Sequence, residues 1–102
     1  MNGDLHMNEG YVYFILDREM DRVKIGYTRR DPNKRLKQLQ TGSSSELELL
    51  YYVEANGFNT ERHLHRLFDA DRCCGEFFNY SYHIKHWIMN NKYLKENKIN
   101  NG

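Results

Sequence analysis

The sequence predicts an α+β fold in which a three-stranded antiparallel sheet is flanked by about three helices. Two observations carry this prediction. Short runs of aromatic and branched apolar residues stand close together near the N-terminus, as adjacent strands do, and segments with apolar residues at helical spacing follow Asp31, Thr60 and Ser81. At 102 residues, the chain is long enough for one small domain with a modest core and too short for two.

The first two strands are predicted at residues 11–15 and 23–28, and residues 17–22 between them form a hairpin loop. In this hairpin Tyr13 and Lys24 can face each other. A neighbouring ammonium group favours the phenolate, which would make Tyr13 a better base or nucleophile near neutral pH. The alternative makes Tyr13 ordinary strand filling and Lys24 a solvated edge charge.

The next element is a helix from Pro32 to about Gln40, because Asp31 offers a capping side chain, proline suits the first helical position and Gly42 offers a stop. Arg35 precedes the apolar Leu39 by one helical turn. Its guanidinium is therefore expected to lean over the buried stripe of the helix, with a head that snorkels into water as the alternative.

A third strand is predicted from residue 46 to residue 55, with its alternating apolar side chains on one face. These side chains are Leu47, Leu49, Tyr51 and Val53. Residues 75–80 form a compact aromatic segment, predicted as a short extended piece or turn against the sheet. A last helix begins after Ser81 and carries Ile84, Trp87, Ile88 and Leu94 at helical spacing.

A second helix, capped by Asn59 or Thr60, is predicted to run to about Phe68. Glu61 falls on the flank of its apolar stripe, and His65, four residues later, lies on the same flank. A carboxylate at the border of a core needs a partner. The dipole of its own helix, an arginine and a metal ion are the three alternatives.

Composition separates this chain from several function classes. A mean hydropathy of −0.90 and the lack of any apolar run of membrane-spanning length exclude a membrane protein, and the polar N-terminus lacks a signal peptide. Cys73 and Cys74 are adjacent, a spacing that rarely forms a disulfide, which fits a reducing, cytoplasmic compartment. Paired with His63 and His65 they have poor spacing for zinc.

Basic residues gather in one segment, although the net charge of the chain is only +1. Between residues 22 and 37 there are seven basic residues against one acid, Asp31. This segment is either a phosphate-binding patch or a solvated helix face and loop. The seven basic residues are Arg22, Lys24, Arg29, Arg30, Lys34, Arg35 and Lys37.

The order of the motifs resembles the GIY-YIG endonuclease superfamily, and within it the phage and microbial branch whose second motif reads Lys-Ile-Gly. The resemblance covers about residues 10–80. It rests on five segments in order: Val12-Tyr13, Lys24-Ile25-Gly26-Tyr27-Thr28, Lys34-Arg35-Leu36-Lys37-Gln38-Leu39, Glu61 through His65, and Gly75-Glu76-Phe77-Phe78. We accordingly divide the chain into a flexible leader (1–9), one GIY-YIG-like domain (10–94) and a polar tail (95–102).

The resemblance implies a metal-dependent DNA endonuclease or nicking domain that hydrolyses phosphodiester bonds. It implies that Tyr13 is the general base or, less often, the nucleophile, that Arg35 stabilises phosphate charge, and that Glu61 holds one Mg²⁺ or Mn²⁺ ion. Lys24 departs from the commoner tyrosine of the second motif, and Tyr27 either supplies a second hydroxyl near the site or packs on the opposite face.

Further residues are secondary candidates for the same site. His65, Glu76 and Asn79 resemble motif positions, and Glu76 alternatively caps or pairs locally. Nucleic-acid contacts are assigned to Arg29, Arg30, Lys34, Lys37 and Asn79. The expected partner is DNA, with RNA as the second choice, and the apolar pattern fits a monomer or a homodimer.

Two other function classes compete with the endonuclease. The first is a catalytically weak or inactive module that binds nucleic acid through the basic segment, and the second is a small interaction protein whose basic surface meets an acidic protein. Hydrolysis of DNA with magnesium or manganese distinguishes the enzyme from both.

Overall fold

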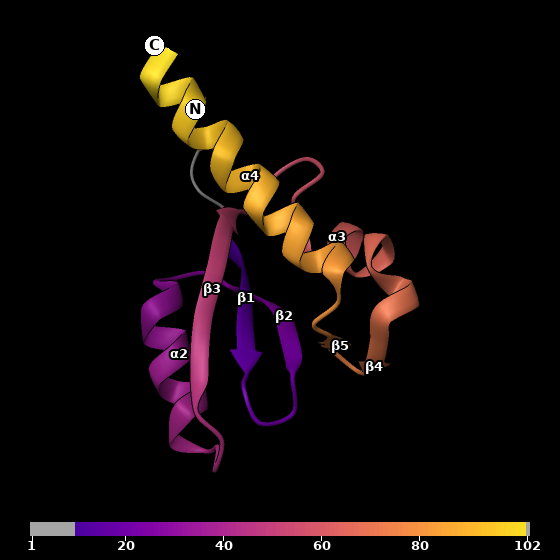
Figure 1. The fold of residues 1–102 in the computed structure, drawn as a ribbon. Coiled ribbons are helices and arrows are strands. Elements are labelled where there is room, and N and C mark those ends of the chain that lie inside the picture. The colour runs from indigo at the N-terminus through magenta and orange to yellow at the C-terminus, as the bar shows by residue number, and fades with distance from the viewer. Residues whose placement is uncertain (1–9, 102) are drawn as a thin grey trace.

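The computed structural model describes residues 10–101, with side chains described as far as residue 94. The fold is α+β, but its sheet contains five antiparallel strands in the order β3-β1-β2-β5-β4 (Figure 1). The prediction of a three-stranded sheet is therefore wrong. The strands are β1 (Tyr11–Asp17), β2 (Arg22–Thr28), β3 (Leu47–Glu54), β4 (Arg72–Cys74) and β5 (Phe77–Asn79). The helices are α2 (Pro32–Thr41), α3 (Glu61–Leu67) and α4 (Tyr82–Asn101), with a 3-10 helix η1 at Asp69–Asp71.

The hairpin predicted at the start of the domain is confirmed. β1 and β2 pair antiparallel over their whole lengths. Tyr13 lies opposite Gly26 and Lys24 opposite Ile15, so the expectation that Tyr13 and Lys24 face each other is wrong: the register offsets them by two residues on the same face. Asp17 closes the loop, because its Oδ1 accepts hydrogen bonds from the backbone N–H groups of Glu19 at 3.1 Å and Met20 at 3.2 Å. Asp21 takes the left-handed φ of 54° that the turn back into β2 requires.

The sheet gains its two extra strands from a short hairpin, β4 and β5, beyond β2. Phe77 and Phe78 of β5 pair with Lys24 and Val23 in the first half of β2, and β4 forms the outer edge. Gly75, at a φ of +54°, makes the turn between the two strands. Three-residue strands are too short to display an alternating pattern, so the sequence indicated only an extended aromatic piece here.

The third strand is present, but its apolar residues do not share one face. The register against β1 shifts between Phe14 and Ile15, where Leu50 has no partner of its own. This β-bulge reverses the alternation, so Leu49 lies on the Ile15 side while Tyr51 lies on the Phe14 side with the core. Hydrophobicity alone does not reveal a bulge, because every residue involved is apolar.

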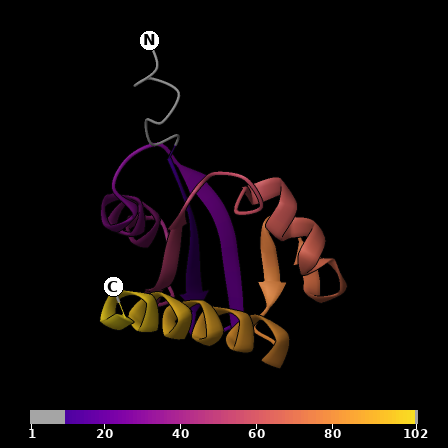
Figure 2. The ribbon, with the colours of Figure 1, turned by 90° about the horizontal axis from the view of Figure 1, so that it is seen from above.

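The two faces of the sheet carry different helices, as Figure 2 shows with α4 on one side of the strands and α2 on the other. The first face holds the hydrophobic core, in which residues of β1, β2, β5, α3 and α4 pack together. Its buried members are Val12, Phe14, Val23, Ile25, Ala55, Leu64, Phe68, Phe78, Ile84 and Ile88. The second face, which carries Tyr13, is covered by α2.

The helices begin where their capping residues predict. Asp31 caps α2 by accepting a hydrogen bond from the N–H of Asn33 at 2.9 Å, and Thr60 caps α3 by accepting one from His63 at 3.1 Å. Ser81 Oγ accepts a hydrogen bond from the N–H of Ile84 at the start of α4. This last helix continues through residues 95–101, the segment expected as a polar tail. The expected leader, 1–9, lies outside the described residues.

Candidate active site

Tyr13 stands at the centre of the second sheet face, with a side chain that is only 1% exposed. Its phenol lies across Gly26 on the neighbouring strand, and a Cβ atom built at Gly26 would lie 2.6 Å from Tyr13 Cζ, which is far inside van der Waals contact. Arg35 reaches over from α2 and donates a hydrogen bond from Nε to Tyr13 Oη at 3.5 Å. The absence of a side chain at Gly26 therefore makes the room in which the Tyr13 hydroxyl meets an arginine.

Lys24 lies on the same face of β2 as Gly26, because strand side chains alternate and the two positions differ by two. Its Nζ forms an ion pair with Glu76 Oε1 at 3.0 Å and stands 5.2 Å from the centre of the Phe77 ring. Glu76, in the turn between β4 and β5, thus places its carboxylate beside Lys24 of the hairpin formed by β1 and β2. Sequence reasoning ranked Glu76 as secondary, and the Gly-Glu-Phe-Phe motif was the signal that pointed to it.

Glu61 and His65 reach this region from α3. Pairing of β2 with β5 ends at Lys24, so the carbonyl of Ile25 has no partner from β5. His65 Nε2 fills that place at 2.7 Å from Ile25 O, which makes Nε2 the protonated ring nitrogen. Glu61 Oε2 lies 3.7 Å from the same nitrogen. Both side chains therefore sit at the β2 edge, as expected from their shared flank of the helix.

The carboxyl groups of Glu61 and Glu76 share this small space and perturb one another. Burial, a hydrogen bond with Glu76 and the charge of Glu76 raise the pKa of Glu61 to about 7, against the opposing charge of Lys24. Burial alone would also raise the pKa of Glu76, but hydrogen bonds with Lys24 and Glu61 and the nearby Lys24 and His65 charges lower it below its ordinary value. Of the two carboxyl groups, Glu61 is therefore the one that keeps its proton to the higher pH.

This pair of carboxyl groups fits a hard divalent cation such as Mg²⁺ better than it fits Zn²⁺. Within residues 10–94 the side chains contain no group of three histidine, cysteine or acidic residues placed to hold a metal. Mg²⁺ needs less, because it binds through one or two carboxylates and keeps several of its waters. Glu61 and Glu76, whose carboxyl groups lie beside each other, are the residues that could hold such an ion.

A basic hollow lies next to Arg35, between the end of β2 and the start of α2. It has a volume of about 300 Å³, a size typical of small-ligand pockets. Its lining includes Thr28, Arg29, Arg30, Lys34 and Arg35. The concentration of cations found in the sequence is therefore preserved in space, and it borders Tyr13 through Arg35.

Three predicted residues lie apart from this arrangement. Tyr27 packs against the hydrophobic core on the face opposite Lys24, which places its hydroxyl outside the group around Tyr13. Lys37 is exposed on α2 and Asn79 is exposed at the end of β5, where its Oδ1 accepts a hydrogen bond from Cys73 Sγ at 3.2 Å. Six of the predicted residues form two sets of contacts, Tyr13 with Arg35, and Lys24 with Glu61, His65 and Glu76 beside β2. We call these six the β2-edge group.

Comparison with known proteins gives one match. A family model, the T5orf172 domain, matches residues 10–96. This domain is a small one found in phage and bacterial proteins, and it is associated with nuclease-like folds. No curated protein and no solved structure matches the chain. Among the described helices, none has the length and apolar character needed to cross a membrane.

Proposed function

The chain belongs to the T5orf172 domain family, and from this membership and the β2-edge group we propose that it is a metal-dependent DNA endonuclease or nicking domain of the GIY-YIG type. Membership by itself is consistent with a nuclease-like or DNA-binding module. The observation that supports hydrolysis is the contact between Tyr13 Oη and Arg35. On the same sheet face, Lys24 forms an ion pair with Glu76, and Glu76 lies beside Glu61.

In this proposal Tyr13 takes the proton of the attacking water. The water oxygen bonds to phosphorus, the bond from phosphorus to one ester oxygen breaks, and solvent returns a proton to the leaving alkoxide. The contact with Arg35 Nε at 3.5 Å holds Tyr13 Oη in the position where it receives that proton. Burial of the ring restricts the hydroxyl to one position, so it costs no reorganisation during the reaction.

The positively charged groups of the site have separate roles in phosphate binding and charge stabilisation. Arg35 borders both Tyr13 and the basic hollow. A phosphate bound in the hollow would therefore contact the planar guanidinium of Arg35 next to Tyr13, the proposed general base. Glu61 would hold one Mg²⁺ or Mn²⁺ ion, which would supply charge stabilisation to the phosphoryl oxygens and the leaving alkoxide. Lys24 holds Glu76 in place beside that carboxylate. The phosphates on either side of the cleaved one bind to Arg29, Arg30 and Lys34, and further out to Lys37 and Asn79.

A specific contact favours the second candidate, a DNA-binding module without hydrolysis. Lys24 already neutralises Glu76 and lies close enough to Glu61 to lower its pKa, so it competes with a divalent cation for the carboxyl pair. If the ion loses this competition, the basic hollow and Arg35 still bind phosphate. Plasmid cleavage distinguishes the two candidates, because only the enzyme converts supercoiled DNA to nicked or linear forms.

The experiment compares the native chain with Tyr13→Phe and Glu61→Gln on supercoiled plasmid in magnesium, in manganese and in a chelator. The native chain is expected to cut with either metal. Tyr13→Phe should lose at least about a hundredfold in rate, the lower bound for removal of a general base, and Glu61→Gln should lose the cutting that depends on the metal. The matched controls are Tyr82→Phe and Glu46→Gln, exposed positions outside the site that should cut normally. Salt-sensitive DNA binding without cutting by the native chain would refute the enzyme and support the binding module.

A further inference from the structure

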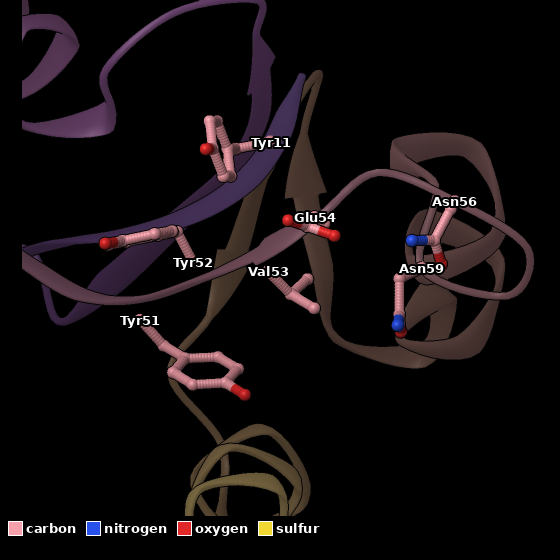
Figure 3. A pocket seen from close by; sticks show the side chains of 7 residues that line it. All are labelled: Tyr11, Tyr51, Tyr52, Val53, Glu54, Asn56 and Asn59. Carbon is pink, nitrogen blue, oxygen red and sulfur yellow. The ribbon is translucent and has the colours of Figure 1, made fainter. Parts of the chain in front are cut away.

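A second hollow opens where the last residues of β3 meet the start of β1, beside the Tyr13 face of the sheet (Figure 3). Its volume of about 510 Å³ lies within the ~300–1,000 Å³ range of small-ligand pockets. We call it the tyrosine groove, after Tyr11 and Tyr52. Its lining includes five polar or aromatic residues, Tyr11, Tyr52, Glu54, Asn56 and Asn59. The proposed hydrolysis and the basic hollow use none of these five.

The exposed ring of Tyr52 and the half-buried ring of Tyr11 form one wall of the tyrosine groove. Tyr52 lies directly across from Tyr13 in the sheet, and its side chain stays 42% exposed although it belongs to a strand. The rings of Tyr11 and Tyr52 meet edge to face at 5.4 Å between centroids. Figure 3 shows them on one side of β3, with the ring of Tyr51 on the other. An aromatic surface is therefore left open beside the proposed catalytic tyrosine.

The rest of the tyrosine groove is unsuited to phosphate. Its lining contains no lysine or arginine, and it includes the exposed carboxylate of Glu54 at the end of β3. Asn56 and Asn59, in the loop that follows, add amide groups that can both donate and accept hydrogen bonds. Aromatic faces with amide and carboxylate groups are the features that stack on nucleobases and recognise the donors on their edges.

The tyrosine groove is also in register with the basic hollow. Tyr11 pairs across the sheet with Thr28, and Thr28 lines that hollow. Tyr13 lies between Gly26, on the side of the carboxyl pair, and Tyr52, on the side of the groove. A DNA strand whose phosphates bind the cations around Arg35 would therefore run past the tyrosine groove. The base next to the bound phosphate would then lie on the side of Tyr52.

We propose that the tyrosine groove is a binding site for one unpaired DNA base next to the cleaved phosphate, which stacks on Tyr52 beside Tyr11. This inference rests on the proposed action on DNA. It adds that the protein prefers single-stranded or distorted DNA, because a base inside a regular duplex is stacked on its neighbours and does not reach the groove. Glu54 favours bases with an amino donor, such as cytosine, over thymine.

The test measures binding of a short single-stranded oligonucleotide with one 2-aminopurine, in chelator, so that no cleavage is needed. Binding by the native chain should quench the fluorescence, and Tyr52→Leu should weaken affinity about 5- to 150-fold, which corresponds to ~1–3 kcal/mol per stacked base. Tyr52→Phe, which keeps the ring, should restore affinity. Tyr82→Leu, at an exposed tyrosine 78% accessible on α4, is the matched control and should bind normally.

Two further arms keep the outcome decisive. Replacing single bases of the oligonucleotide by abasic sites tests the native chain itself, and one abasic position should reproduce the loss seen with Tyr52→Leu. Regular duplex should bind Tyr52→Leu and the native chain equally. Unchanged single-strand affinity in Tyr52→Leu and in the whole abasic series would overturn the groove proposal while leaving the nuclease proposal intact. Quenching without plasmid cleavage would refute the nuclease and support the groove.

Discussion

Gly26→Ala is the sharpest structural test of how Tyr13 is positioned. The added Cβ would stand 2.6 Å from Tyr13 Cζ and 3.0 Å from Cε1, whereas carbon atoms pack best at ~3.5–4.0 Å. The Tyr13 ring would have to move by about 1 Å, and as a side chain only 1% exposed it has no free space to enter. Overpacking of this kind costs ~1–3 kcal/mol.

Urea unfolding followed by circular dichroism measures this cost. We expect Gly26→Ala to lose ~1–3 kcal/mol in the free energy of unfolding and about 4–24 °C in Tm, given ~4–8 °C per kcal/mol for a domain of this size. Gly42→Ala is the matched control, because a Cβ there meets no atom within 4 Å and its φ of −95° is ordinary for alanine. Its change should stay within ~0.5 kcal/mol.

The double variant Gly26→Ala with Tyr13→Phe separates overpacking from other effects of the alanine. Removing Oη eliminates one of the colliding atoms and leaves Cζ, so part of the lost stability should return relative to Tyr13→Phe alone. Equal stability of Gly26→Ala and Gly42→Ala would refute the reasoning, since it would mean that the Tyr13 ring does not occupy the space above Gly26.

Two further predictions concern the β2 edge. The pKa of Glu61 is raised from 4.5 to about 7, so the folded protein keeps a proton that the unfolded chain releases, and this group lowers stability as pH rises from about 4.5 to 7. In melts from about pH 5 to 8, Glu61→Gln, which can still donate a hydrogen bond to Glu76, should gain stability relative to the native chain as pH rises; parallel profiles would contradict this. His65→Ala leaves the buried Ile25 carbonyl without its side-chain partner and should lower the free energy of unfolding by ~1–3 kcal/mol. The exposed control His63→Ala should lower it by less than ~0.5 kcal/mol. Equal losses for the two variants in chemical unfolding would argue against the His65 contact.

Much of the fold follows from local signals. The hairpin of β1 and β2, the caps at Asp31 and Thr60, and the shared flank of Glu61 and His65 were predictable because each depends on residues within a few positions of one another. The lean of Arg35 toward the sheet followed in the same way from helical spacing, and the structure confirms it with the contact to Tyr13.

Other features depended on pairing between distant segments. β4 and β5 are too short to show a pattern, and they become strands because Phe77 and Phe78 find partners in β2. The bulge at Leu50 reverses the faces of β3 in a run of residues that is apolar throughout, so no change of polarity marks it.

For the candidate site, the sequence by itself determined which chemical groups are present and the order in which the chain carries them. Only the tertiary structure decided which groups become neighbours: it joined Glu76 to Lys24 and Glu61, and it opened a groove beside Tyr52. The physical reason is that strand alternation and helix period fix the direction of a side chain within its own element, while the neighbour it meets depends on long-range register.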